Sequence, residues 1–150
     1  MTKFKSEFLR ILRERGFIHQ CTDETNLDEL LQQNIPKVGY IGFDCTADSL
    51  HVGSLIQIML LRWYQKSGHK PIVLMGGGTT KVGDPSGKDE LRQIITEDAI
   101  TANMKSIQRI FENFLSFEEG PAGALVVNNA DWLNQLESVS YTHLTLPTKA

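Results

Sequence analysis

Residues 37–54 read KVGYIGFDCTADSLHVGS and contain the clearest strand-to-helix transition in the chain. In the first seven residues, β-branched and aromatic side chains stand among glycines, which predicts a strand that other groups can approach closely. A polar turn follows over residues 44–49, and its last residues can cap a helix. Apolar residues on most sides of residues 50–67 then predict a buried helix. A strand, a turn and a helix in this order indicate one unit of an α/β fold.

Strands and helices also alternate outside this stretch. Short apolar runs at residues 71–75 and 124–128 predict two more strands, of the kind buried in a parallel sheet. Apolar side chains at helical spacing predict the remaining elements, which are helices at residues 3–15, 26–33, 88–95, 97–115 and 131–136. The alternation predicts a parallel sheet with flanking helices and right-handed crossovers.

Composition places the chain in a broad class. It has 150 residues and a net charge of -3, which fits one domain with a core and gives no reason to expect a protein that coats nucleic acid. Cys21 and Cys45 are the only cysteines and lack metal-ligand spacing, so we expect two reduced thiols. No apolar leader opens the chain, and its longest apolar stretch is too short to cross a bilayer, which favours a cytoplasmic protein.

A glycine-rich loop is expected over residues 76–87, directly after the second strand. The carboxyl edge of an open α/β sheet is where ligands bind. GGGTTK at residues 76–81 lacks the third glycine of a dinucleotide fingerprint, and GDPSGK at residues 83–88 has one residue too few between its glycines for a P-loop. We therefore expect a flexible ligand-binding loop of another kind, in which Asp84 is the charged side chain.

A second group of candidate residues surrounds the end of the first strand. We expect Tyr40 and Asp44 at the carboxyl end of this strand, Thr46 on the turn, and His51 in the first turn of the next helix. A helix amino terminus has unpaired N–H groups that suit phosphates, and His51 can add a donor. Gly53 lacks a side chain, which lets a flat adenine ring approach the backbone. A histidine at a helix start is by itself more often a cap, so only the combination is specific.

Three motifs in order resemble the bacterial-type tyrosyl-tRNA synthetases, a class I family. They are GFDCTADSLHVGS at residues 42–54, GDPSGK at residues 83–88 and NNADW at residues 128–132. The resemblance covers residues 1–136 and implies the N-terminal part of a Rossmann-like catalytic domain, truncated relative to the family. Such an enzyme activates L-tyrosine with ATP to tyrosyl-adenylate and transfers the tyrosyl group to tRNA(Tyr). We expect residues 137–150 to be a disordered or non-native tail, and the chain to be an incomplete fragment.

The resemblance also implies roles for individual residues. For tyrosine they are Tyr40, Asp84, Thr79 and Asn129; for ATP they are Asp44, His51, Gly53 and Ser54; and the catalytic pair is Thr46 and His51. Lys88 and Arg92 are candidates for phosphate or tRNA contacts, with a solvated helix face as the alternative. Ser54 departs from the family, because it stands where the motif His-Ile-Gly-His has its second histidine.

The same resemblance implies substrates and partners. ATP is a substrate, Mg²⁺ is expected with it but without an assigned protein ligand, and the full-length family member is expected to be a homodimer. Two alternatives remain. One is a catalytically inactive remnant that binds nucleotide and amino acid, which the missing lysine-rich pyrophosphate loop of the family favours for the isolated chain. The other is a related nucleotidyltransferase, against which Tyr40 and the GDPSG motif argue.

Overall fold

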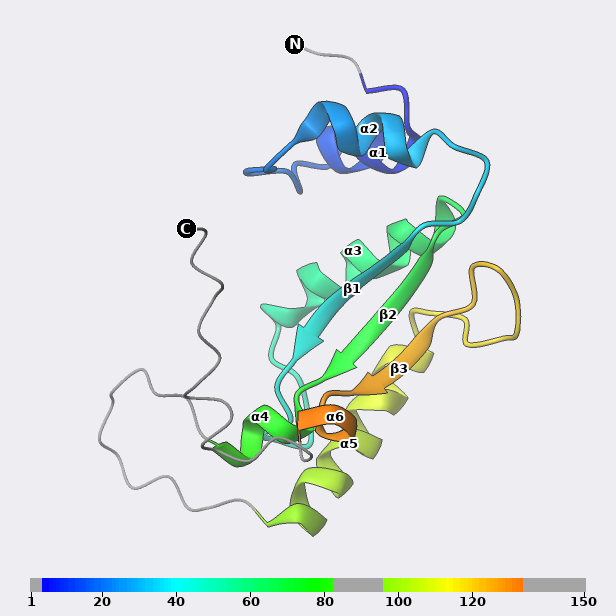
Figure 1. Ribbon diagram of the computed structural model, residues 1–150. Coiled ribbons are helices and arrows are strands. Elements are labelled where there is room, and N and C mark those ends of the chain that lie inside the picture. The colour runs from blue at the N-terminus through cyan, green and yellow to red at the C-terminus, as the bar shows by residue number, and fades with distance from the viewer. Residues whose placement is uncertain (1–3, 83–95, 134–150) are drawn as a thin grey trace, which may run out of the picture.

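The computed structural model describes residues 4–82 and 96–133, which form a three-stranded sheet and its flanking helices (Figure 1). In chain order the elements are α1 (Glu7–Glu14), α2 (Glu24–Leu31), β1 (Val38–Phe43), α3 (Ser54–Lys66), β2 (Lys70–Met75), α4 (Gly77–Val82), α5 (Glu97–Glu112), β3 (Leu125–Asn128) and α6 (Ala130–Leu133). The strands are parallel and lie in the order β1-β2-β3. The predicted α/β class and parallel sheet are therefore confirmed. No described helix is long and apolar enough to cross a lipid bilayer.

One face of the sheet carries the main core. The long helices α3 and α5 lie behind this face in Figure 1, as they must when crossovers join parallel strands. Val73 and Met75 of β2 are fully buried against Ile107 and Phe111 of α5. The Phe111 ring meets the ring of Phe43 edge to face, with centroids 4.8 Å apart. This packing fixes the sheet against α5 and so sets where the strand ends lie.

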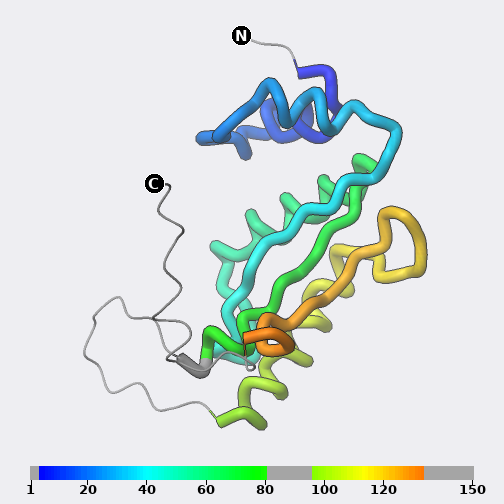
Figure 2. Tube along the Cα trace, in the orientation of Figure 1, coloured from blue at the N-terminus to red at the C-terminus, as the bar shows by residue number. Residues whose placement is uncertain are grey.

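The helices α1 and α2 form a hairpin at the amino ends of the strands, the opposite end from α4 and α6 (Figure 2). The Asp28 carboxylate of α2 accepts hydrogen bonds from the backbone N–H of Lys5 and Ser6 and from the Ser6 hydroxyl. It thereby satisfies donors at the start of α1. Phe8 meets Tyr64 of α3 edge to face, with centroids 5.0 Å apart, so aromatic packing joins the hairpin to the rest of the fold.

Three predicted features of α3 are wrong: its first residue, its cap and its burial. The helix begins at Ser54 rather than at residue 50, because a turn occupies residues 51–54: the Ser54 N–H donates to the His51 carbonyl at 2.9 Å. The cap is Gly53, with no capping side chain from the polar turn. The helix is also buried on one side only. Leu55 and Ile56 are 42% and 60% exposed, because the sheet covers only the face that carries Ile58 and Leu61.

The predicted flexible loop after β2 is also wrong over its first part. Residues 77–82 form the short helix α4 instead of a flexible loop, because the carbonyl of Gly76 accepts the backbone N–H and the hydroxyl of Thr80 and so begins a helical turn. The predicted helix at residues 88–95 and the predicted tail at residues 137–150 lie outside the described residues.

Candidate functional site

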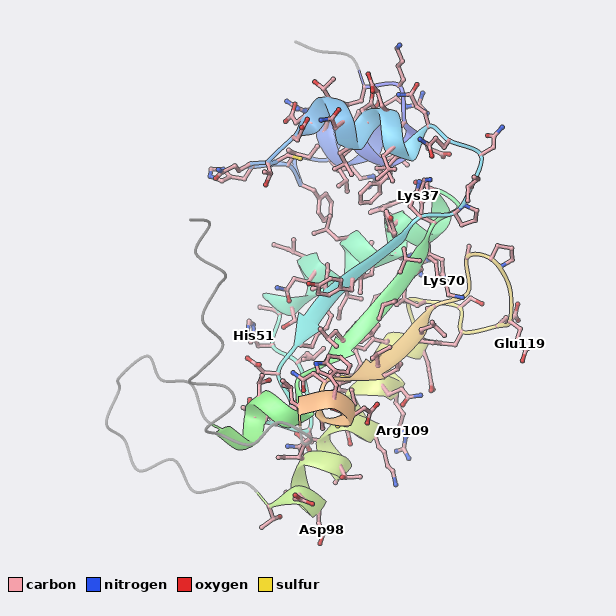
Figure 3. The ribbon with its side chains drawn as sticks, viewed as in Figure 1. Lys37, His51, Lys70, Asp98, Arg109 and Glu119 are labelled. Carbon is pink, nitrogen blue, oxygen red and sulfur yellow. The ribbon has the colours of Figure 1, made fainter. Side chains whose placement is uncertain are left out.

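The candidate site lies at the carboxyl edge of the sheet, where all three strands end side by side. The Gly76 N–H, after β2, donates to the Phe43 carbonyl at 2.8 Å, and the Asn129 N–H, after β3, donates to the Met75 carbonyl at 3.0 Å. Figure 3 shows His51 at this end of the sheet, while Lys37 and Lys70 mark the amino ends of the strands. The residues that follow the strands are therefore neighbours in space, as expected for a parallel sheet.

Glycine is required where α4 begins. A Cβ at Gly77 would lie 2.5 Å from Oδ1 of Asn128, and a Cβ at Gly78 would lie 3.1 Å from the Cα of Ala130. At Gly78 the obstacle is backbone, which cannot move away easily, and at Gly77 it is the Asn128 amide, whose Oδ1 is held by the Ala130 N–H at 3.0 Å. The glycines thus let α4 pack directly on the segment after β3.

Asn129 and Thr79 hold this contact together. Asn129 is 8% exposed, and its Oδ1 accepts from the Gly78 N–H at 2.7 Å. Its Nδ2 donates to the Thr79 hydroxyl at 3.2 Å, which in turn donates to the Gly76 carbonyl at 3.2 Å. The two residues predicted near the amino acid are therefore direct neighbours, and their polar groups are engaged with each other. A contact of either with tyrosine stays a prediction.

The turn after β1 presents the residues predicted for ATP. Asp44, Thr46, His51 and Gly53 are all exposed, whereas Ser54 is buried, at 8% exposed. His51 lies before the helix rather than in its first turn, because its Nδ1 accepts from the Gly53 N–H at 2.9 Å. A neutral imidazole that accepts at Nδ1 carries its proton on Nε2. His51 is thus oriented to offer an Nε2–H donor.

The space beside Gly53 is occupied by protein. A Cβ at Gly53 would lie 2.6 Å from Cε1 of His51, so here the glycine makes room for the imidazole ring. The prediction that Gly53 makes room for adenine would require this ring to move, and it stays a prediction.

Tyr40 lies in the middle of β1 rather than at its end, which corrects its predicted place. It is in register with Ile72 of β2, which in turn pairs with Leu125 of β3. Its side chain is 69% exposed and belongs to the sheet face opposite the main core. A Cβ built at Gly42, two residues on and on the same face, meets no atom of the described residues within 4 Å, so none of these residues lies directly over this glycine.

Two functional candidates were missed in the sequence. Thr80 and Asn103 both bind the backbone of Cys45, at the centre of the turn after β1: the Cys45 N–H donates to the Thr80 hydroxyl at 3.4 Å, and Asn103 Nδ2 donates to the Cys45 carbonyl at 2.9 Å. A signal for Asn103 existed, because it lies three residues after Ile100 and four before Ile107, on the apolar stripe of its helix. Thr80 gave no signal beyond its place in the glycine-rich segment.

Asp84, Lys88 and Arg92 lie outside the described residues. Within the part of the chain that the structure describes, no three His, Cys, Asp or Glu side chains gather as a metal site would require. Burial raises the pKa of the Cys45 thiol, which is fully buried, so a structural role suits it better than nucleophilic chemistry.

Comparisons with known proteins point in one direction. The sequence model of the family described as tRNA synthetases class I (W and Y) matches residues 32–143. The chain is 60% identical over 141 residues to the tyrosine–tRNA ligase of Rhodospirillum rubrum, and 60% identical over 142 residues to that of Novosphingobium aromaticivorans. Each match covers 94% of this chain and 34% of the relative. The chain therefore spans about a third of the length of the curated relatives it matches.

Solved structures agree with these relatives. The C-terminally truncated mitochondrial tyrosyl-tRNA synthetase of Aspergillus nidulans superposes with a TM-score of 0.73 at 26% identity, over 95% of this chain and 44% of that one. The corresponding enzyme of Coccidioides posadasii gives a TM-score of 0.69 at 29% identity, over 95% of this chain and 42% of that one. The similarity thus extends from sequence to the arrangement of the strands and helices.

Proposed function

The chain belongs to the class I tRNA synthetases of the tryptophan and tyrosine type, and from this premise we propose that it carries the tyrosine- and ATP-binding part of a tyrosine–tRNA ligase. The observation that carries the proposal is the position of Tyr40. Its phenol stands exposed on the open sheet face beside Gly42, over which none of the described residues lies directly. This geometry supports a site in which an aromatic amino acid lies against the sheet.

Tyrosine binds, in this proposal, between the open sheet face and the start of α4. The Tyr40 hydroxyl hydrogen-bonds the substrate hydroxyl, and Asp84 pairs with the substrate ammonium. Thr79 and Asn129 lie at the same edge of the sheet and fix the backbone that leads towards Asp84. A site built to pair with the phenolic hydroxyl disfavours phenylalanine, since a buried polar group would then lose its partner.

ATP binds along the turn after β1. Asp44 and Ser54 flank this turn, and Gly53 lies under the adenosine once the His51 ring has moved away from it. A carboxylate oxygen of tyrosine attacks the α-phosphorus of ATP and forms a bond to it. The bond from this phosphorus to the oxygen that bridges to the β-phosphate breaks, and pyrophosphate leaves with that oxygen. The step needs positioning and donors aimed at the developing negative charge rather than a protein nucleophile. Thr46 and the Nε2–H of His51 supply such donors without acid–base chemistry.

The proposal extends to partners beyond the described residues. The adenylate passes its tyrosyl group to tRNA(Tyr) in the full-length protein, for which we propose a homodimer and a cytoplasmic location. Mg²⁺ accompanies the ATP phosphates and is assigned no protein ligand, since the described carboxylates form no cluster. Lys88 and Arg92 are proposed to contact phosphate or tRNA. For the isolated chain we propose binding of tyrosine and ATP with little turnover.

Calorimetry on the chain tests the binding proposal. L-tyrosine and ATP should each give a saturable heat, and L-phenylalanine, the control that lacks only the hydroxyl, should bind more weakly. Equal affinity for tyrosine and phenylalanine would contradict the assignment of this site to tyrosine.

Kinetics on a full-length protein that carries this region tests the chemistry. His51→Ala should slow tyrosine-dependent exchange of pyrophosphate into ATP by about 10- to 10³-fold, the cost of losing a donor to transition-state charge, with little change in tyrosine affinity. His19→Ala, which changes an exposed histidine outside the site, is the matched control. An unchanged exchange rate in His51→Ala would eliminate the role given to His51.

A further inference from the structure

The backbone of one residue, Cys45, is held from two sides. Its N–H donates to the Thr80 hydroxyl of α4, and its carbonyl accepts from Asn103 of α5. Both contacts span long stretches of sequence, 35 and 58 residues respectively. The peptide groups that lead from Asp44 to Thr46 are therefore tied to two different helices.

The Thr80 hydroxyl has one partner on each side of it. It donates to the Gly76 carbonyl at 2.7 Å and accepts from the Cys45 N–H at 3.4 Å. A hydroxyl with one donor partner and one acceptor partner has a fixed orientation. Thr80 thus bridges the end of β2 and the turn after β1, which a side chain of the same shape without the hydroxyl would leave unconnected.

Asn103 supplies the second tie from the partly buried surface of α5. Its Nδ2 lies 2.9 Å from the Cys45 carbonyl, a good hydrogen-bond distance. The Cys45 side chain is fully buried under the same helix, so the peptide can neither rotate outward nor find water easily. A buried carbonyl that loses its donor carries an energetic cost, and the turn would shift to recover a partner.

We infer that Thr80 and Asn103 are positioning residues for the nucleotide part of the site, acting through the backbone of Cys45. This inference rests on the proposed function, since it assumes that Asp44 and Thr46 contact ATP. Neither residue touches the ligand. Each keeps the flanking side chains in one place, so that little ordering is needed when ATP binds.

The neighbouring threonine provides an internal contrast. Thr79 is tied to Asn129, after β3, while Thr80 is tied to Cys45, after β1. Two consecutive hydroxyls of α4 therefore support two different strand ends. Loss of the Thr80 or Asn103 tie should weaken ATP binding, and loss of the Thr79 tie should affect tyrosine binding.

Calorimetry on the chain separates these effects. Thr80→Val keeps the shape of the side chain and removes the hydroxyl, and Asn103→Leu keeps the approximate size and removes the donor without adding a charge. Each should weaken ATP binding by about two- to tenfold, as expected for one net hydrogen bond, while tyrosine affinity stays unchanged. Thr80→Ser keeps the hydroxyl and should restore ATP affinity. Thr79→Val should instead weaken tyrosine binding and leave ATP affinity unchanged.

Asn113→Ala is the matched control, since Asn113 caps the end of α5 and its side chain donates to the carbonyls of Arg109 and Ile110 of the same helix. Unchanged ATP affinity in Asn103→Leu and Thr80→Val would overturn the inference, and so would equal weakening of ATP and tyrosine binding, which would indicate a general structural role. If Thr80→Val does not fold, the Asn103 variant decides alone. A parent chain that binds neither ligand would instead contradict the proposed function, and the inference with it.

Discussion

The two faces of the sheet are built from the same strands but serve different purposes. On one face, Phe43, Val73 and Met75 pack against α3 and α5 and are buried almost completely. On the other, Tyr40 and Leu125 are 69% and 45% exposed. Successive residues of a strand point to opposite faces, so this contrast comes from alternate positions of the same strands.

The two faces also differ in how tightly their side chains are packed. Parallel sheets are usually covered on both faces, and β2 has apolar residues on both, with Ile72 and Leu74 on the open side. Among the described residues, tight packing exists on the covered face only. A connected apolar surface that stays exposed is typical of a face that binds something. The covered face therefore fixes the strand ends, and the open face is the one to which the proposed ligand is assigned.

The largest expected effect comes from deleting a ring on the covered face. Phe111→Ala should lower the free energy of unfolding by about 3–5 kcal/mol, because the fully buried ring leaves a cavity beside Phe43. Leu125→Ala, its control on the open face, should cost about 1 kcal/mol or less, since much of that side chain is already in water. Urea unfolding followed by circular dichroism measures both. Equal losses of unfolding free energy in the two variants would show that the two faces contribute equally to stability.

Two glycines of β1 give a finer test, because one lies on each face. A Cβ at Gly39 would lie 3.0 Å from Cε1 of Tyr64, whose ring is held between Phe8 and His69, so Gly39→Ala should destabilise by about 1–3 kcal/mol. A Cβ at Gly42 meets nothing, so Gly42→Ala should stabilise by about 0.4–1 kcal/mol by restricting the unfolded chain. Thermal unfolding should show shifts of opposite sign. A loss of stability in Gly42→Ala would mean that the open face is covered.

Local patterns predicted the order of the elements but not the details of the site. Apolar runs and turn residues identified the three described strands, because a short apolar run bounded by turn residues can be recognised in a short window. The start of α3 was missed, since the bond between His51 and the Gly53 N–H takes the place of a helical turn. The helix α4 was missed for another reason: it is held by Asn129, which lies about fifty residues further along the chain and is invisible to a local pattern.

The candidate residues divide in the same way. Asp44 and the glycine-rich segment that contains Thr79 were expected at the carboxyl edge and lie there, since residues after parallel strands must meet there. Tyr40 was expected at the strand end, but it lies in the middle of β1, where only the pairing register shows its position. Hydrogen bonds from a side chain to a distant backbone group depend on packing: Asn103 could be noticed only as a polar residue on an apolar helix stripe, and the partner of Thr80 could not be predicted at all.

Titration of His69, at the edge of the covered face, should make the free energy of unfolding depend on pH, with a smaller effect than the substitutions above. The side chain is 5% exposed, its ring lies 4.8 Å from that of Tyr64, and its Nδ1 accepts from the Lys37 N–H. Burial, helped by the charge of Lys37, lowers the pKa of His69 below its ordinary value of 6.5. The unfolded chain therefore binds this proton more readily. The contribution of the neutral His69 side chain to stability is complete above about pH 6.5 and is lost as the pH falls through the lowered pKa.

Urea unfolding at a series of pH values measures this loss. His69→Gln keeps an acceptor for the Lys37 N–H but does not titrate, so it should flatten the dependence below about pH 6.5, the ordinary histidine pKa. His19→Gln, at an exposed position, should leave the parent profile intact. A profile that stays steep in His69→Gln would assign the dependence to other groups.

Tyr40→Phe should have the smallest effect on stability and the most specific effect on binding. The hydroxyl stands on the open face and makes no hydrogen bond within the described residues, so unfolding should change by no more than about 0.5 kcal/mol. If the open face is the tyrosine site, tyrosine affinity should fall by about two- to tenfold with the loss of one hydrogen bond, and the preference over phenylalanine should narrow. Calorimetry with both amino acids measures this. An undiminished preference in a fully folded variant would mean that Tyr40 does not read the hydroxyl, and the open face would lose its assigned ligand.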